Sequence, residues 1–149
     1  MKNIGSVKED LSTEKRISIT PEIVKKFIQL GFSVNLEKNY AEHLTINDVD
    51  YKNSGANINS SKEQVFEKSD IILAVNFPSA DQVNLIKNES ILIGQFDLNL
   101  DQNTINELLK KNIKIFSLNL LPRITRAQSM DVLSSQANLA GYKSVLESF

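Results

Sequence analysis

The sequence predicts an α/β fold, a doubly wound and mainly parallel five-stranded sheet of the Rossmann or flavodoxin type with flanking helices. Short apolar segments alternate along the chain with longer segments of helical periodicity. Two of the short segments, residues 71–75 and 90–94, are mostly apolar, as expected of parallel strands that are buried on both faces. With 149 residues, 41% of them hydrophobic, the chain can bury a core of its own.

The first third of the chain predicts a β-α-β unit. We expect a strand over residues 3–7, then a polar loop, and a short strand-like segment over residues 16–19. A helix follows, with Thr20 as its N-cap and Pro21 in its first position, where the missing N–H of proline costs nothing. Apolar residues alternate over residues 32–36, which predicts the second strand.

The middle of the chain predicts two short helices and then the first of the two buried strands. The helices are expected over residues 45–55 and 60–68, and Ser61 and Gln64 have the spacing of a capping box in the second of them. Asn76 comes directly after the buried strand. Ligands of open α/β sheets bind outside the carboxyl ends of the strands, so we expect Asn76 to form part of a pocket wall.

The last third continues the alternation of helices and strands. Helices are expected over residues 80–87 and 101–112, with Asp101 as the N-cap of the second, and a fifth strand over residues 113–118. Strands that alternate with helices in this way form parallel sheets with right-handed crossovers.

The composition excludes several classes of function. A net charge of −1 and the lack of long basic runs argue against binding to nucleic acid or anionic lipid. The chain has no cysteine, and a lone histidine, His43, cannot build a zinc site, so no metal is expected. Its five glycines are isolated from one another, so no glycine-rich phosphate loop is present. No export signal or apolar run of membrane-spanning length is evident.

Residues 122–141 are rich in polar, charged and small side chains at helical spacing. We predict that this segment carries the functional site. Thr125 and Gln128 have the spacing of a capping box, which predicts a helix that begins at Arg126. Gln128 and Asp131 then lie on one face of this helix.

Arginine is concentrated in the same segment. The chain has 14 lysines but only three arginines, and two of these, Arg123 and Arg126, lie here. A guanidinium can donate two parallel hydrogen bonds to a carboxylate or phosphate, which lysine cannot. The alternative is that Arg126 and Asp131 form a solvated ion pair of little consequence and that Gln128 only caps a helix.

Two segments resemble a known family. The sequence PRITRAQSMDVLSSQANLAGYKSVLES, residues 122–148, resembles the loop and helix that overlie the nicotinamide in the NAD(P) transhydrogenase alpha subunit. Residues 5–39 resemble the opening of the wider superfamily of alanine dehydrogenases and transhydrogenases. The residues that carry this second resemblance are Lys8, Glu9, Arg16, Thr20, Pro21 and Gly31.

The resemblance implies the N-terminal part of the NAD(H)-binding component of a proton-translocating NAD(P) transhydrogenase. Such an enzyme transfers hydride between NAD(H) and NADP(H). The matching positions imply that Arg123, Gln128, Asp131 and Ser134 contact NAD(H), with Gln128 as the catalytic residue. Hydride transfer needs no protein nucleophile, only a ring held at the right angle and distance. In the alternative interpretation, the four residues only pack the helix against its neighbours.

The resemblance also implies a domain organisation and partners. Residues 1–125 would form the α/β N-terminal domain, and residues 126–149 would begin the long helix leading to an absent Rossmann domain that completes the NAD(H) site. NADP(H) would bind to a beta subunit that also carries the membrane domains. The full alpha subunit would form a homodimer, cytoplasmic and peripheral to the inner membrane. The isolated chain is expected to be inactive, and its apolar stripe of Val132, Leu139 and Leu146 to be covered by something else.

Two other functions remain open. The chain could be a non-catalytic binding or assembly module in which Arg16 and Arg123 recognise a small carboxylate. It could also be a fragment similar to alanine dehydrogenase. Alanine dehydrogenases have a catalytic lysine and a catalytic histidine, and the polar residues nearest to those positions here are Asn76 and Asp97. Neither can replace the lysine or the histidine, which argues against this last interpretation.

Overall fold

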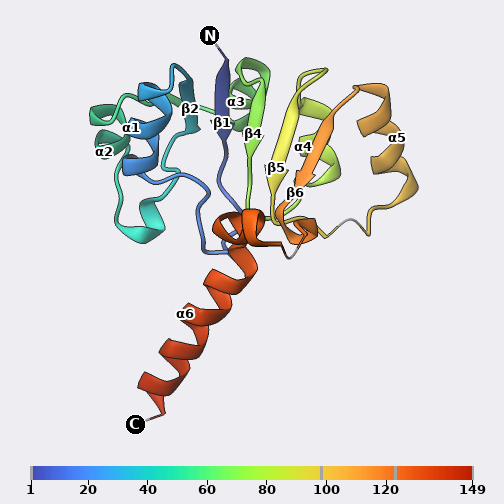
Figure 1. Cartoon of the computed structure of the whole chain (residues 1–149). Helices are drawn as coiled ribbons and strands as arrows, with labels where there is room; N and C mark the ends of the chain where they lie inside the picture. Colours follow the sequence, from blue (N-terminus) through green and yellow to red (C-terminus); the bar gives the residue numbers. More distant parts are fainter. Residues whose placement is uncertain (1, 98, 123, 149) are drawn as a thin grey trace.

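The computed structural model describes residues 2–97, 99–122 and 124–148, which form a parallel six-stranded sheet in the order β3-β2-β1-β4-β5-β6, flanked by helices (Figure 1). The strands are β1 (Asn3–Ser6), β2 (Ser33–Glu37), β3 (Asn57–Asn59), β4 (Ile71–Leu73), β5 (Ile91–Gly94) and β6 (Lys114–Ser117). The helices are α1 (Pro21–Gln29), α2 (Asp48–Asn53), α3 (Lys62–Lys68), α4 (Ala80–Leu85), α5 (Gln102–Lys110) and α6 (Val132–Glu147). Short 3₁₀ turns are η1 (Glu42–Leu44), η2 (Leu118–Leu120) and η3 (Thr125–Met130). The α/β fold class is confirmed.

Two buried apolar clusters lie on opposite faces of the sheet. Ile4 of β1 belongs to the first cluster, together with residues of β2, α1 and α2. The next residue, Gly5, faces the other way, where an added Cβ would meet Val65 and Ser69 at α3. The second cluster lies on that side and contains Val65, Phe66 and Ile72. Figure 1 shows α3 and α4 behind the sheet and α1 in front of its left half.

Several predicted helix starts are confirmed in detail. The Thr20 hydroxyl accepts a hydrogen bond from the Ile23 N–H at 3.4 Å, and Pro21 occupies the first turn of α1. Asp101 caps α5, because its carboxylate accepts the N–H groups of the second and third helical residues. At α3, Ser61 is the N-cap residue as predicted, but the capping box does not form. The Gln64 amide oxygen instead accepts the backbone N–H of the preceding residue, Ser60, at 3.2 Å.

Two parts of the sheet prediction were wrong. The sequence predicted five strands, but the edge strand β3 adds a sixth, paired with β2. The segment over residues 16–19 is not a strand. The backbone N–H of Ser18 donates a hydrogen bond to the hydroxyl of the buried Tyr40 at 3.0 Å. A side chain that is distant in the sequence therefore accepts this hydrogen bond, in place of a carbonyl of a neighbouring strand.

The predicted helix start at Arg126 was also wrong. Residues 125–130 form the 3₁₀ turn η3, which lacks a side-chain cap, and α6 begins at Val132 with Asp131 as its cap. Helix α6 projects away from the carboxyl edge of the sheet (Figure 1), and Leu139 and Leu146 on it are 62% and 60% exposed. Within the described residues, no helix is both long enough and apolar enough to cross a membrane.

We expect a pH-dependent ion pair to stabilise the amino edge of the sheet. The Asp70 carboxylate accepts hydrogen bonds from the Asn3 N–H at 3.0 Å and the Lys87 ammonium at 2.7 Å, which together lower its pKa. A lowered pKa in the folded state stabilises the fold above the unfolded-state pKa of about 3.9, and this stabilisation is lost as the pH falls below it. Urea unfolding should therefore show Asp70→Asn to be less stable than the native chain at pH 7, with the difference shrinking below about pH 4. A difference that persists unchanged at pH 3 would contradict this.

Candidate functional site

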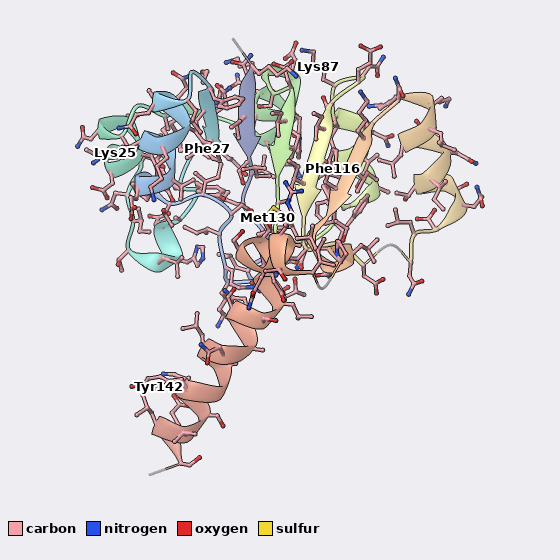
Figure 2. The ribbon with its side chains drawn as sticks, in the orientation of Figure 1. Lys25, Phe27, Lys87, Phe116, Met130 and Tyr142 are labelled. Atoms are coloured by element: carbon pink, nitrogen blue, oxygen red, sulfur yellow. The ribbon has the colours of Figure 1, made fainter. Side chains whose placement is uncertain are left out.

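A hollow of about 300 Å³ lies at the carboxyl edge of the sheet, where the chain leaves β6 and turns into α6. Figure 1 shows η3 and the start of α6 beneath the strand ends, and Figure 2 labels Met130 of the same turn. Three of the four predicted site residues, Gln128, Asp131 and Ser134, line this hollow. The fourth, Arg123, lies outside the described residues. The fold therefore brings the described part of the predicted set together.

Asp131 and Ser134 are joined by two hydrogen bonds. The Asp131 carboxylate accepts the backbone N–H of Ser134 at 3.0 Å and its hydroxyl at 2.6 Å. The first bond satisfies a free donor at the start of α6, where a negative charge is also favoured by the helix dipole. These bonds hold both side chains in defined positions at the N-terminus of α6.

Gln128 is exposed on η3 and is anchored through its backbone. Its carbonyl oxygen accepts the Asp131 N–H at 3.3 Å, and the neighbouring Ala127 is buried, with its N–H bonded to the Ile124 carbonyl at 2.9 Å. The side-chain amide can donate and accept hydrogen bonds at once. The hollow is thus lined by an amide, a carboxylate and a hydroxyl together with several aliphatic side chains. The aliphatic lining residues are Leu118, Leu121, Ile124 and Leu133.

Glu9 links the two central strands at the same edge of the sheet. With this strand order the crevice of the sheet opens between β1 and β4. Glu9 follows β1, and its carboxylate accepts the N–H groups of Val75 at 2.6 Å and Asn76 at 3.4 Å, just after β4. Burial raises the pKa of this carboxyl, while the two N–H groups act in the opposite direction. Asn76 and Glu9 both line a second hollow of about 370 Å³, so the prediction of Asn76 as a pocket wall is confirmed.

Arg16 already has a carboxylate partner within the chain. Its Nε and Nη2 atoms donate to the two oxygens of the buried Glu14 at 2.9 and 2.7 Å, and this pairing lowers the pKa of Glu14. Arg16 also lines a third hollow of about 470 Å³, together with Ser18 and Gln136. Because two N–H groups of its fork face Glu14, Arg16 is poorly placed to bind a free carboxylate in the bidentate manner.

The sequence matches a family model described as "Alanine dehydrogenase/PNT, N-terminal domain" over residues 5–140. The chain belongs to this family. A relative from Rhodospirillum rubrum, named as the first part of "NAD(P) transhydrogenase subunit alpha", is 37% identical over 149 residues, which is 97% of this chain and 39% of that protein. "NAD(P) transhydrogenase subunit alpha" of Haemophilus influenzae is 33% identical and matches 97% of this chain and 28% of its own length. The chain thus spans well under half the length of these relatives.

Solved structures agree with the family assignment. The crystal structure of transhydrogenase from Sinorhizobium meliloti superposes with a TM-score of 0.88 at 36% identity, over 98% of this chain and 43% of that chain. An L-alanine dehydrogenase superposes with a TM-score of 0.71 at 20% identity over 78% of this chain, which shows a shared fold. The chain therefore corresponds to the N-terminal domain of an alpha subunit of the transhydrogenase type.

Reasoning from the sequence missed one structural role in this domain of the alanine dehydrogenase/PNT family. Glu9 was noted only as part of a family pattern, yet it bridges the ends of β1 and β4. The signal available in the sequence was a charged pair, Lys8 and Glu9, placed directly after a strand. Lys8 forms an ion pair with Glu37 at 3.5 Å, whereas Glu9 accepts hydrogen bonds from the backbone that follows β4.

Proposed function

We propose that this domain forms one wall of the NAD(H) site in a proton-translocating NAD(P) transhydrogenase, which transfers hydride between NAD(H) and NADP(H). The observation that carries the proposal is the convergence of Gln128, Asp131 and Ser134 on one hollow at the carboxyl edge of the sheet. The names of the relatives support the reaction, and ligands of open α/β sheets bind at this edge.

Each residue has a role that suits its chemistry. Gln128 would bond to the carboxamide of the nicotinamide or to a ribose hydroxyl, because an amide both donates and accepts. Asp131 and Ser134, already ordered by their mutual hydrogen bonds, would fix the carboxamide or the nicotinamide ribose. Arg123 would pair with a phosphate or with Asp131.

When bound, NAD(H) supplies the hydride chemistry itself, and the protein supplies position and exclusion of water. Four aliphatic side chains, those of Leu118, Leu121, Ile124 and Leu133, line the same hollow as the three polar ones. A hydride donor and acceptor react efficiently only when held close together and aligned. The domain therefore needs no nucleophile and no general base for its part in the reaction.

The proposed setting includes further parts. Residues 1–125 form the N-terminal domain and residues 126–149 lead to a Rossmann domain that completes the NAD(H) site. A beta subunit carries NADP(H) and the membrane domains, and two alpha subunits form a homodimer. The assembly is cytoplasmic and attached to the inner membrane through its partners.

The isolated chain should bind NADH very weakly, because it has no glycine-rich loop to hold the pyrophosphate. Isothermal titration should detect no binding in the micromolar range. A fusion of this chain to the portion of the Rhodospirillum rubrum relative that lies beyond the matched region should bind NADH and, with the beta subunit, restore hydride transfer. Micromolar binding of NADH to the isolated chain, or a folded fusion that binds no NADH, would contradict the proposal.

A further inference from the structure

A buried chain of hydrogen bonds runs from the backbone of Ser18 to the backbone of Leu73. The Ser18 N–H donates to the Tyr40 hydroxyl at 3.0 Å, and the hydroxyls of Tyr40 and Ser6 lie 2.8 Å apart. Ser6 in turn donates to the Leu73 carbonyl at 2.7 Å. Because this bond uses the single hydroxyl proton of Ser6, Tyr40 must donate to Ser6, so each proton in the chain has one position. Ser6 and Tyr40 are 0% and 2% exposed, so water does not compete for these bonds.

Both ends of this chain line the third hollow, the one of about 470 Å³. Ser18 belongs to the segment of residues 16–18, which lines the hollow, and Leu73 ends β4, whose following residues line it as well. Tyr40 is the side chain through which these two parts of the wall are connected. Its hydroxyl therefore fixes how far apart they lie.

The segment of residues 16–19 depends on side chains for its position. Within the described part of the chain, no backbone group of this segment bonds to another backbone group. Its backbone is held instead by the side chains of Glu14, Tyr40 and Tyr51. The Ser18 hydroxyl is buried and finds no hydrogen-bond partner among the described residues, so it does not help to hold the segment. Loss of the Tyr40 hydroxyl would free the part of the segment that lines the hollow.

The third hollow adjoins the first hollow, the one of about 300 Å³. Leu118 lines both of them. In α6, Val132 and Gln136 line the third hollow, whereas Leu133 and Ser134 line the first. The start of α6, which lies beneath the strand ends in Figure 1, thus borders both hollows. A change in the width of the third hollow would therefore shift the helix start that carries the proposed nucleotide contacts.

We propose that Tyr40 is a positioning residue for hydride transfer, which acts through the backbone of Ser18 on the wall of the third hollow and thereby on the start of α6. The inference rests on the proposed function, because it takes the start of α6 to orient the nicotinamide. A misplacement of about 1 Å at the reacting centre can cost about a hundredfold in rate, so a small shift of this wall is enough. Burial raises the pKa of the Tyr40 hydroxyl, so the group keeps its proton and can donate throughout the neutral range.

Tyr40→Phe removes the hydroxyl and keeps the ring, and Tyr51→Phe is its matched control. Tyr51 is also fully buried, its ring meets that of Tyr40 edge-to-face at 5.7 Å, and its hydroxyl donates to the Ile19 carbonyl, outside the lining of the hollow. Hydrogen exchange followed by NMR in the isolated chain gives the first measurement. The Ser18 amide should exchange at least about tenfold faster in Tyr40→Phe and not in Tyr51→Phe, because only the first variant leaves this N–H without its acceptor.

The second measurement uses the fusion assembled with the beta subunit. Tyr40→Phe should lower the rate of hydride transfer about tenfold and keep the affinity for NADH within about twofold of the native value. Tyr51→Phe should lower the melting temperature to a similar extent and leave the rate unchanged, which separates positioning from a loss of stability.

Unchanged exchange at Ser18 in Tyr40→Phe would overturn the proposal. Equal rates of hydride transfer in the two variants of an active fusion would also overturn it, and would leave the proposed function standing. If the native fusion is folded but neither binds NADH nor transfers hydride, the proposed function itself fails, and Tyr40 has no reaction to position.

Discussion

If the proposed site is correct, Gln128→Ala should lower the rate of hydride transfer by roughly ten- to a hundredfold in the complete fusion assembled with the beta subunit, because the nicotinamide ring would lose a contact that orients it. Gln128 is exposed and its anchoring hydrogen bond uses its backbone carbonyl, so the variant should melt at the native temperature. Stopped-flow measurement of NADP⁺ reduction by NADH gives the rate, and titration with NADH gives the affinity. We expect most of the loss in the rate and little in the affinity.

Asn138→Ala is the matched control for this experiment. Asn138 is an exposed amide on α6 that does not line the hollow beside Gln128. Its loss should leave both the rate and the affinity unchanged. If Gln128→Ala and Asn138→Ala transfer hydride equally fast, Gln128 has no part in the reaction and the hollow is a packing feature of the turn.

Helix starts could be predicted from sequence wherever one local signal stood alone. Thr20 followed by Pro21 is such a signal, and so is Asp101 before an amphipathic run. Near the site two signals compete, because Thr125 with Gln128 and Asp131 with Ser134 both suit a helix start. The structure uses Asp131, whose carboxylate bonds to both donors of Ser134, and leaves the earlier turn as 3₁₀. Local pattern alone could not rank the two.

The parts that could not be predicted depend on contacts distant in the sequence. Strand β3 is only three residues long and contains two asparagines, so it has no apolar alternation and exists because β2 pairs with it. The segment around Ser18 alternates like a strand but bonds to Tyr40. Glu9 likewise acquires its role only when β1 and β4 become neighbours. For the candidate site, the residue set came from the resemblance, and the structure shows that Gln128, Asp131 and Ser134 line one hollow.

Phe66→Ala should destabilise the isolated chain strongly, by about 3–5 kcal/mol, because it removes a large side chain from a closed core. Phe66 is 0% exposed on α3 and packs in the second apolar cluster with Val65, Ile72 and Leu92. These neighbours come from helix α3 and strands β4 and β5, so they can collapse only partly into the space left behind. Urea unfolding monitored by circular dichroism measures the loss.

Phe116→Ala is the counterpart on the other side of the sheet, with the same side chain removed from an open environment. Phe116 keeps 57% of its surface in solvent, so its loss should cost less than about 1 kcal/mol in the isolated chain. A small cost for Phe66→Ala would mean that the core beneath α3 is loosely packed. A large cost for Phe116→Ala would mean that this side chain is already covered in the isolated chain.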